Sequence, residues 1–122
     1  VLIQPFMPEV STEGEWSLMF FNGVFSHAVL STPKAGDFRV QRMHGGSVQL
    51  VVPDASMIHE AQKVLEAVPY GIPLYARVDF IRKDASYYLM EIELIEPALF
   101  MKFDPLAADR FATAISQLLK PS

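Results

Sequence analysis

The amino-acid sequence predicts an α+β domain, in which an antiparallel β-sheet carries two main helices packed on one side. Three observations lead to this fold class. The dipeptide Asn22-Gly23, a strong hairpin signal, separates two strand-like runs. A second pair of strand-like runs, rich in β-branched and aromatic residues, spans 75–97. Two further stretches, 54–68 and 104–119, repeat apolar residues at helical spacing and predict the two helices.

Size, charge and composition narrow the classes of function. The chain has 122 residues, enough for a single domain over 1–122, and 51% of them are hydrophobic. No apolar run reaches the roughly 18 residues of a membrane span, so we expect the excess hydrophobicity to lie at an interface. A net charge of -4 argues against nucleic-acid binding, and the absence of cysteine excludes disulfides and thiol nucleophiles. There is no signal-peptide pattern, and the start at Val1, inside an apparent strand, suggests part of a longer protein.

The first third of the chain is expected to be mostly strand. Residues 1–7 are apolar and strand-like, with Pro5 suited to a strand end, and 8–14 are polar turn material. Two strands are predicted over 15–21 and 24–31. Asn22-Gly23 joins them, because a type I′ turn needs positive φ at both central positions.

A loop with cations and glycines follows. Over 32–46 it holds Lys34, Arg39, His44 and Gly45-Gly46, and a short strand comes after it at 48–52. Such residues suit phosphate oxygens, which take charge-assisted bonds from cations and from backbone N–H groups that glycine leaves accessible. An ordinary solvent-exposed loop explains the same residues equally well. His44 is the one histidine placed near a ligand, since the three histidines form no site by spacing, and no Gly-x-Ser-x-Gly turn presents a nucleophile.

The two helices have recognisable boundaries. The first begins after Asp54, the expected N-cap, and ends before Pro69. The second begins at Asp104-Pro105, which places proline at the first helical position. Both are expected to face the core with an apolar stripe: Met57, Ile58, Ala61, Val64, Leu65 and Val68 in the first, and Phe111, Ala114, Ile115, Leu118 and Leu119 in the second.

The strand pair within 75–97 carries the chemistry. A three-residue loop over 84–86 would place Asp79 opposite Glu91 and Arg77 opposite Glu93, with Cβ atoms about 5 Å apart. Like charges at that distance destabilise a sheet, and a hard divalent cation such as Mg²⁺ would relieve them. The alternative is a solvated polar face whose charge Arg77 partly neutralises.

These residues together resemble the C-terminal part of an ATP-grasp domain, the kind found in bacterial glutathione synthetase and related carboxylate–amine ligases. The resemblance covers nearly the whole chain. The segment 4–8 is similar to the hinge strand whose backbone meets adenine, and Glu15 to the acidic residue near the ribose. The hairpin at Asn22-Gly23 follows as it does in the family.

The rest of the resemblance concerns phosphates and metal. Lys34, Arg39 and Gly45-Gly46 fall where the family keeps its phosphate and substrate loop. The segments 77–79 and 91–93 resemble the strands with the metal ligands, although Glu93 stands where the family has asparagine and adds a charge. The site residues so implied are metal ligands Asp79, Glu91 and Glu93, nucleotide-binding Gln4, Phe6, Met7, Glu15, Gly45 and Gly46, and catalytic Lys34 and Arg39.

The resemblance implies a ligase that phosphorylates a carboxylate with ATP and joins the acyl phosphate to an amine. ATP and Mg²⁺, or Mn²⁺ in its place, would be the cofactors, and small carboxylates and amines the substrates. Cytoplasmic location, without nucleic-acid or membrane partners, is the corresponding expectation.

The resemblance covers only part of the family's domain. In the family the preceding half supplies a substrate-binding domain and a lid, which the 122 residues do not include. We therefore expect the isolated chain to be inactive. The alternative function is a non-catalytic structural or interaction fragment that self-associates through the apolar surface left by the missing half.

Overall fold

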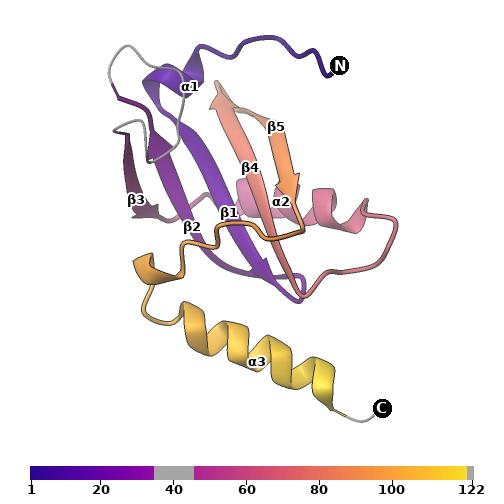
Figure 1. The fold of residues 1–122 in the computed structure, drawn as a ribbon. Helices are drawn as coiled ribbons and strands as arrows, with labels where there is room; N and C mark the ends of the chain where they lie inside the picture. The colour runs from indigo at the N-terminus through magenta and orange to yellow at the C-terminus, as the bar shows by residue number, and fades with distance from the viewer. Residues whose placement is uncertain (35–45, 121–122) are drawn as a thin grey trace.

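The computed structural model describes residues 1–34 and 46–120 (Figure 1). The α+β class and the antiparallel sheet predicted from the sequence are confirmed. In chain order the elements are α1 (Glu9–Thr12), β1 (Glu15–Phe21), β2 (Val24–Thr32), β3 (Ser47–Val51), α2 (Ala55–Glu66), β4 (Tyr75–Lys83), β5 (Ser86–Glu93), the short 3-10 helix η2 (Met101–Phe103) and α3 (Ala107–Leu119). No helix in the described ranges is long and apolar enough to cross a membrane.

The five strands lie in the order β3-β2-β1-β4-β5, and every neighbouring pair is antiparallel. The predicted hairpin is confirmed, because Asn22 and Gly23 form a two-residue turn with φ values of 52° and 78°. β2 carries a bulge, since Met19 pairs with His27 but Phe20 with Phe25, which leaves Ser26 without a partner in the ladder.

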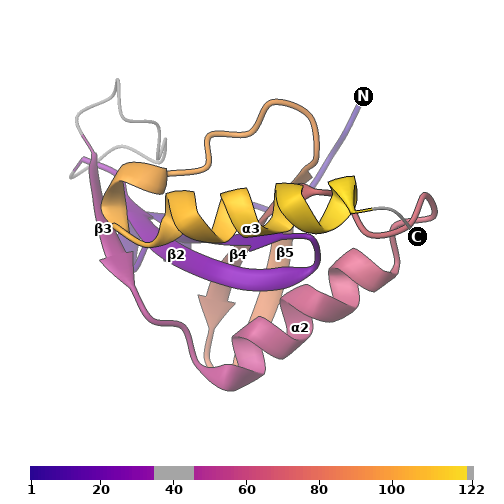
Figure 2. The same cartoon turned by 90° about the horizontal axis from the view of Figure 1, so that it is seen from below.

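The core lies between the sheet and α2, which covers one face (Figure 2). Side chains alternate along a strand, so the even-numbered residues of β1 and β4 share this face. They form one cluster with α2: Trp16, Leu18, Phe20, Ala28, Met57, Ala61, Leu65, Ala76, Val78 and Phe80. The apolar stripe predicted for α2 is therefore confirmed, with Ile58 and Val64 packed at its margin.

The two main helices do not share a face of the sheet. Phe111 of α3 packs edge-on against Phe21, with ring centroids 4.8 Å apart, and Phe21 points away from the α2 side. The predicted core role of the α3 stripe is right for Ala114, which is 3% exposed, and wrong for Leu118 and Leu119, which are 56% and 78% exposed. The reason is position: α3 lies along the end of the sheet, so its last turns extend past the strands (Figure 1).

A strap, residues 94–100, leaves β5 and crosses the sheet face opposite α2 before η2 begins (Figure 1). Two of its residues, Glu96 and Phe100, have positive φ values of 55° and 50°. Such backbone is uncommon outside glycine and persists only where the surroundings hold it.

The β4–β5 connection corrects the predicted loop. Lys83 pairs with Ser86, so the turn holds two residues, with Asp84 at φ 55°, instead of three. A bulge between Asp79 and Phe80 then shifts the register by one residue. The two differences cancel, and Asp79 still faces Glu91 while Arg77 faces Glu93, as predicted.

Two boundary predictions are wrong, and a third is confirmed. Residues 1–7 form no strand, because no neighbouring strand pairs with them, and 8–14 contain the single turn α1. Asp54 is the N-cap of α2, as predicted, although its side chain makes no capping hydrogen bond and lies 3.7 Å from Arg82. α3 begins at Ala107, later than predicted, because the Asp104 carboxylate accepts from the Leu106 N–H at 2.9 Å and closes a turn first.

Candidate functional site

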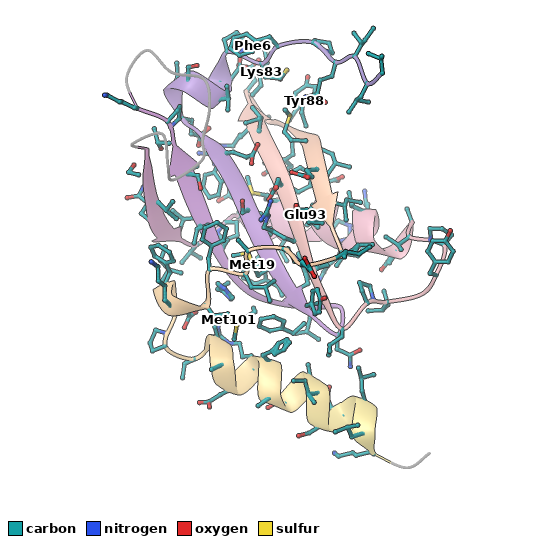
Figure 3. All side chains as sticks on the ribbon, viewed as in Figure 1. Phe6, Met19, Lys83, Tyr88, Glu93 and Met101 are labelled. Carbon is teal, nitrogen blue, oxygen red and sulfur yellow. The ribbon has the colours of Figure 1, made fainter. Side chains whose placement is uncertain are left out.

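Four carboxylates and one arginine gather on the sheet face that the strap crosses. Strand register brings them together: Ser17 pairs with Asp79 and Met19 with Arg77, while Asp79 and Arg77 pair with Glu91 and Glu93. Glu15, two residues before Ser17, points to the same face. We call Glu15, Asp79, Glu91 and Glu93 the carboxylate cluster. Figure 3 places Glu93 and Met19 on this face.

Arg77 is the common partner of three of these carboxylates. Its Nε and Nη2 donate to Asp79 Oδ1 and Oδ2, both at 2.9 Å. Nη2 also lies 2.7 Å from Glu93 Oε2 and 3.8 Å from Glu91 Oε2. Arg77 and Glu93, which the sequence placed opposite each other, therefore form a cross-strand ion pair.

Burial makes the Arg77–Asp79 pair the anchor of the cluster. The Asp79 side chain is 0% exposed and that of Arg77 13%. Burial by itself would lower the pKa of Arg77, but the hydrogen bonds and charge of Asp79 outweigh it and raise that pKa. A planar guanidinium bound at two points to a buried carboxylate is geometrically specific as well as strong.

One arginine does not neutralise four carboxylates. Burial, together with the charges of Asp79, Glu91 and Glu93, raises the pKa of Glu15 to about 7 against the opposing charge of Arg77. Burial and the neighbouring charges of Glu93 and Asp79 also raise the pKa of Glu91. The cluster therefore holds surplus negative charge, which is the electrostatic requirement for a cation.

The carboxylate cluster has the right kind of ligand atoms for a divalent cation, but its side chains are not arranged around a metal position. The donors are hard carboxylate oxygens, which Mg²⁺ prefers. Within the described part of the chain, however, no group of three His, Cys, Asp or Glu residues is arranged to hold a metal ion. The oxygens of Asp79, Glu91 and Glu93 converge on the Arg77 guanidinium instead. Their role as metal ligands stays a prediction.

Comparison with known proteins gives the family context. No protein-family model matches the sequence. The cycloserine biosynthesis protein DcsG of Streptomyces lavendulae is 33% identical over an alignment 135 residues long. The alignment covers 99% of this chain and 43% of that protein. A crystal structure of D-cycloserine synthetase DcsG superimposes with a TM-score of 0.78 at 30% identity, covering 96% of this chain and 42% of that one.

More distant structures share the fold. The ATP-grasp ligase PsnB, in a complex with Mg and ADP, has a TM-score of 0.62 at 14% identity, covering 88% of this chain and 34% of that one. The D-alanine–D-alanine ligase of Bacillus anthracis, in a complex with ATP, has a TM-score of 0.58 at 16% identity, with coverages of 86% and 38%. This chain therefore shares the fold of a part of these ligases, the ATP-grasp ligase PsnB among them. It spans less than half the length of the relatives it matches.

The other residues that the sequence predicted for the site are described only in part. Lys34 is exposed beyond the end of β2, and Arg39 and Gly45 lie outside the described residues. Gly46 has a structural reason to be glycine, since a Cβ there would lie 2.6 Å from the Thr32 carbonyl oxygen. The loop therefore stays a prediction, because only its two ends are described.

The predicted adenine hinge includes Phe6, which lies nearer the end of the sheet than Glu93 does (Figure 3). Gln4 and Phe6 are exposed and Met7 is half-buried, in a segment that forms no strand. Figure 3 shows Phe6 at the same end of the sheet as Lys83, where the β4–β5 turn lies. Nucleotide contact by these three residues remains untested.

Sequence reasoning missed two features of the site. It placed Glu15 apart from the metal carboxylates, although alternation along β1 could have put Glu15 on the face of Asp79 once β1 and β4 were known to be neighbours. It also assigned no role to His27. No local pattern marks His27, because its partner is a backbone carbonyl 72 residues later in the chain.

Proposed function

We propose that this chain is the C-terminal, nucleotide- and Mg²⁺-binding portion of an ATP-dependent carboxylate–amine ligase, similar to glutathione synthetase, that acts through an acyl phosphate. The observation that carries the proposal is the carboxylate cluster around Arg77 on an ATP-grasp fold. Relatives with this fold include a D-cycloserine synthetase and a D-alanine–D-alanine ligase, and an ATP-grasp ligase was captured with Mg and ADP. Cytoplasmic location belongs to the same proposal, because the reaction uses ATP.

Each residue has a role that follows from its chemistry. Asp79, Glu91 and Glu93 would hold Mg²⁺, or Mn²⁺ in its place. The ion, when bound, supplies positive charge to phosphate oxygens. The fork of donors on Arg77 matches a carboxylate or a phosphate equally, so Arg77 can turn toward a bound phosphoryl group while Asp79 holds its Nε.

Polar groups outside Arg77 complete the proposal. A Glu15 carboxyl with a pKa of about 7 is partly protonated at neutral pH, so it can donate as well as accept a hydrogen bond. That suits the hydroxyls of a ribose. Lys34, Arg39 and the glycines Gly45 and Gly46 would bind the transferred phosphate, and the segment with Gln4, Phe6 and Met7 would meet the adenine.

Calorimetry with Mg²⁺ and a non-hydrolysable ATP analogue tests the proposal. Glu91→Gln removes one predicted ligand. The Glu91 side chain is 54% exposed, and its contact with Arg77 is a long one of 3.8 Å, so the fold should survive the substitution. We expect metal-dependent nucleotide binding in the wild type and its loss in Glu91→Gln. Glu66→Gln, an exposed carboxylate on α2, is the matched control and should bind as the wild type does.

ATP turnover provides a second test. In the full-length protein, Asp79→Asn should remove most ATP turnover in the presence of the correct carboxylate and amine. Undiminished turnover in Asp79→Asn, or undiminished nucleotide binding in Glu91→Gln, would contradict the metal assignment.

A second candidate function is an interaction module. It is favoured by the apolar end of α3, where Leu118 and Leu119 are exposed. Sedimentation of the chain at several concentrations distinguishes the two, because an interaction module should associate as concentration rises. A clean monomer at high concentration would argue against it.

A further inference from the structure

Two side chains on the site face hold consecutive carbonyls of the strap. Arg77 Nη1 donates to the Ala98 carbonyl oxygen at 3.3 Å, and His27 Nε2 lies 2.8 Å from the Leu99 carbonyl oxygen. The two donors come from different strands, β4 and β2, and both pair with Met19 of β1 between them. The strap is thus clamped on both sides of the central strand that it crosses.

The tautomer of His27 is fixed by its partners. A carbonyl oxygen only accepts, so Nε2 carries the proton that is donated to Leu99. Nδ1 is then the acceptor for the Ser26 hydroxyl, 2.7 Å away. Burial lowers the pKa of His27, whose side chain is 3% exposed, so the ring is neutral at pH 7 as this pattern requires.

The surroundings of His27 are held by α3. Ser26 is the bulged residue of β2, and its carbonyl accepts from Arg110 Nη1 at 3.0 Å in place of a ladder partner. The same Nη1 donates to Asp104 Oδ2 at 2.8 Å. Phe21 closes one side of the ring, with centroids 6.1 Å apart. Ser26 and Phe21 therefore restrict the orientation of the His27 ring independently of its contact with the strap.

We propose that His27 is a positioning residue that acts on Arg77 through the strap. By anchoring the Leu99 carbonyl, His27 keeps the adjacent Ala98 carbonyl where Arg77 Nη1 reaches it. That contact adds a third point of attachment to the two hydrogen bonds that Arg77 makes with Asp79, and so limits rotation of the guanidinium away from the carboxylate cluster. The clamp itself does not depend on the proposed function, whereas its effect on nucleotide binding does.

Two variants at His27 separate the hydrogen bond from the bulk of the ring. His27→Phe keeps a ring beside Phe21 but removes both nitrogens, whereas His27→Gln keeps an N–H at the position of Nε2. In the full-length protein we expect His27→Phe to speed amide exchange of residues 95–101 about tenfold, the loss of one net hydrogen bond. His27→Gln should stay close to the wild type.

The Arg77 Nε–H signal in a nitrogen–proton NMR spectrum is the readout that a merely structural role would not move. We expect its exchange with water to be faster in His27→Phe and restored in His27→Gln. A matched control is Ser26→Ala, which removes the hydroxyl at Nδ1 but leaves the Nε2 donor in place; it should leave both strap exchange and the Arg77 signal nearly unchanged.

The outcomes are distinct. A folded His27→Phe variant with wild-type strap exchange, or with a mobile strap and an unchanged Arg77 signal, overturns the proposal. If His27→Phe does not fold, the nitrogen shifts of wild-type His27 decide, because a ring protonated at Nδ1 at pH 7 contradicts the clamp. Absence of nucleotide binding in the wild type would overturn the proposed function only, since the exchange and NMR readouts need no nucleotide.

Discussion

At the scale of single residues, Glu15 shows how a crowded site changes acid–base behaviour. Its pKa in the folded protein, about 7, lies above the ordinary 4.5 because of burial first and the neighbouring carboxylates second. An acid with a raised pKa binds more protons in the folded state, so the free energy of unfolding falls as pH rises between those two values. Metal-free protein should therefore lose stability from pH 5 to pH 8.

Glu15→Gln tests whether the ionisation of Glu15 causes this pH dependence of stability. The substitution removes the ionisation but keeps the shape, so we expect it to raise the free energy of unfolding at pH 8 by about 1 to 3 kcal/mol and to change little at pH 5. Urea denaturation at the two pH values, with a chelator present, measures both numbers. Equal effects at pH 5 and pH 8 would show that Glu15 does not titrate in this range.

The Arg77–Asp79 pair leads to a prediction of opposite sign. Arg77→Gln leaves the fully buried Asp79 carboxylate without its partner, which should lower the free energy of unfolding by about 3 to 5 kcal/mol. Arg77→Gln combined with Asp79→Asn removes the buried charge as well. Chemical denaturation should show the double variant to be more stable than Arg77→Gln alone; an additive loss would contradict the account of a buried, unpaired charge.

At the scale of elements, local sequence signals determine the hairpin turns, whereas contacts between distant segments determine which other stretches become strands. Asn22-Gly23 fixed the β1–β2 turn because both residues can adopt positive φ. The Asp79–Glu91 register was predicted correctly although the turn was one residue shorter and a bulge made up the difference. Residues 1–7 have strand composition but no strand beside them, and composition alone cannot supply a partner.

Gly23 allows a sharp test of the β1–β2 turn. A Cβ at Gly23 would meet two obstacles: a φ of +78° and the Ile72 Cγ2 atom at 2.8 Å. Gly71 shares only the first, with φ +85° and nothing within 4 Å. We expect Gly71→Ala to lower the free energy of unfolding by about 1 kcal/mol and Gly23→Ala to lower it by more than that. Thermal unfolding compares them, and equal losses would mean that the Ile72 side chain moves aside freely.

At the scale of the whole molecule, the features that the sequence did not reveal all depend on contacts between distant segments. The apolar stripe of α3 predicted a helix but not its place at the sheet end, which leaves Leu118 and Leu119 exposed. The strap has no periodic pattern, since Arg77 and His27 hold it by its backbone. Glu15 joined the carboxylate cluster only through the neighbouring positions of β1 and β4 in the sheet.

The surplus charge of the cluster predicts how the protein as a whole responds to a divalent cation. An ion that binds only the folded state at ten times its Kd adds about 1.4 kcal/mol to the free energy of unfolding. At pH 8 Glu15 is ionised and the cluster is most negative, so Mg²⁺ should raise the Tm more at pH 8 than at pH 6. Thermal melts with MgCl₂, against NaCl of equal ionic strength, measure the difference. Glu91→Gln combined with Glu93→Gln should abolish it, and an equal response to the two salts in the wild type would rule out a specific cation site, because screening alone would then explain the shift.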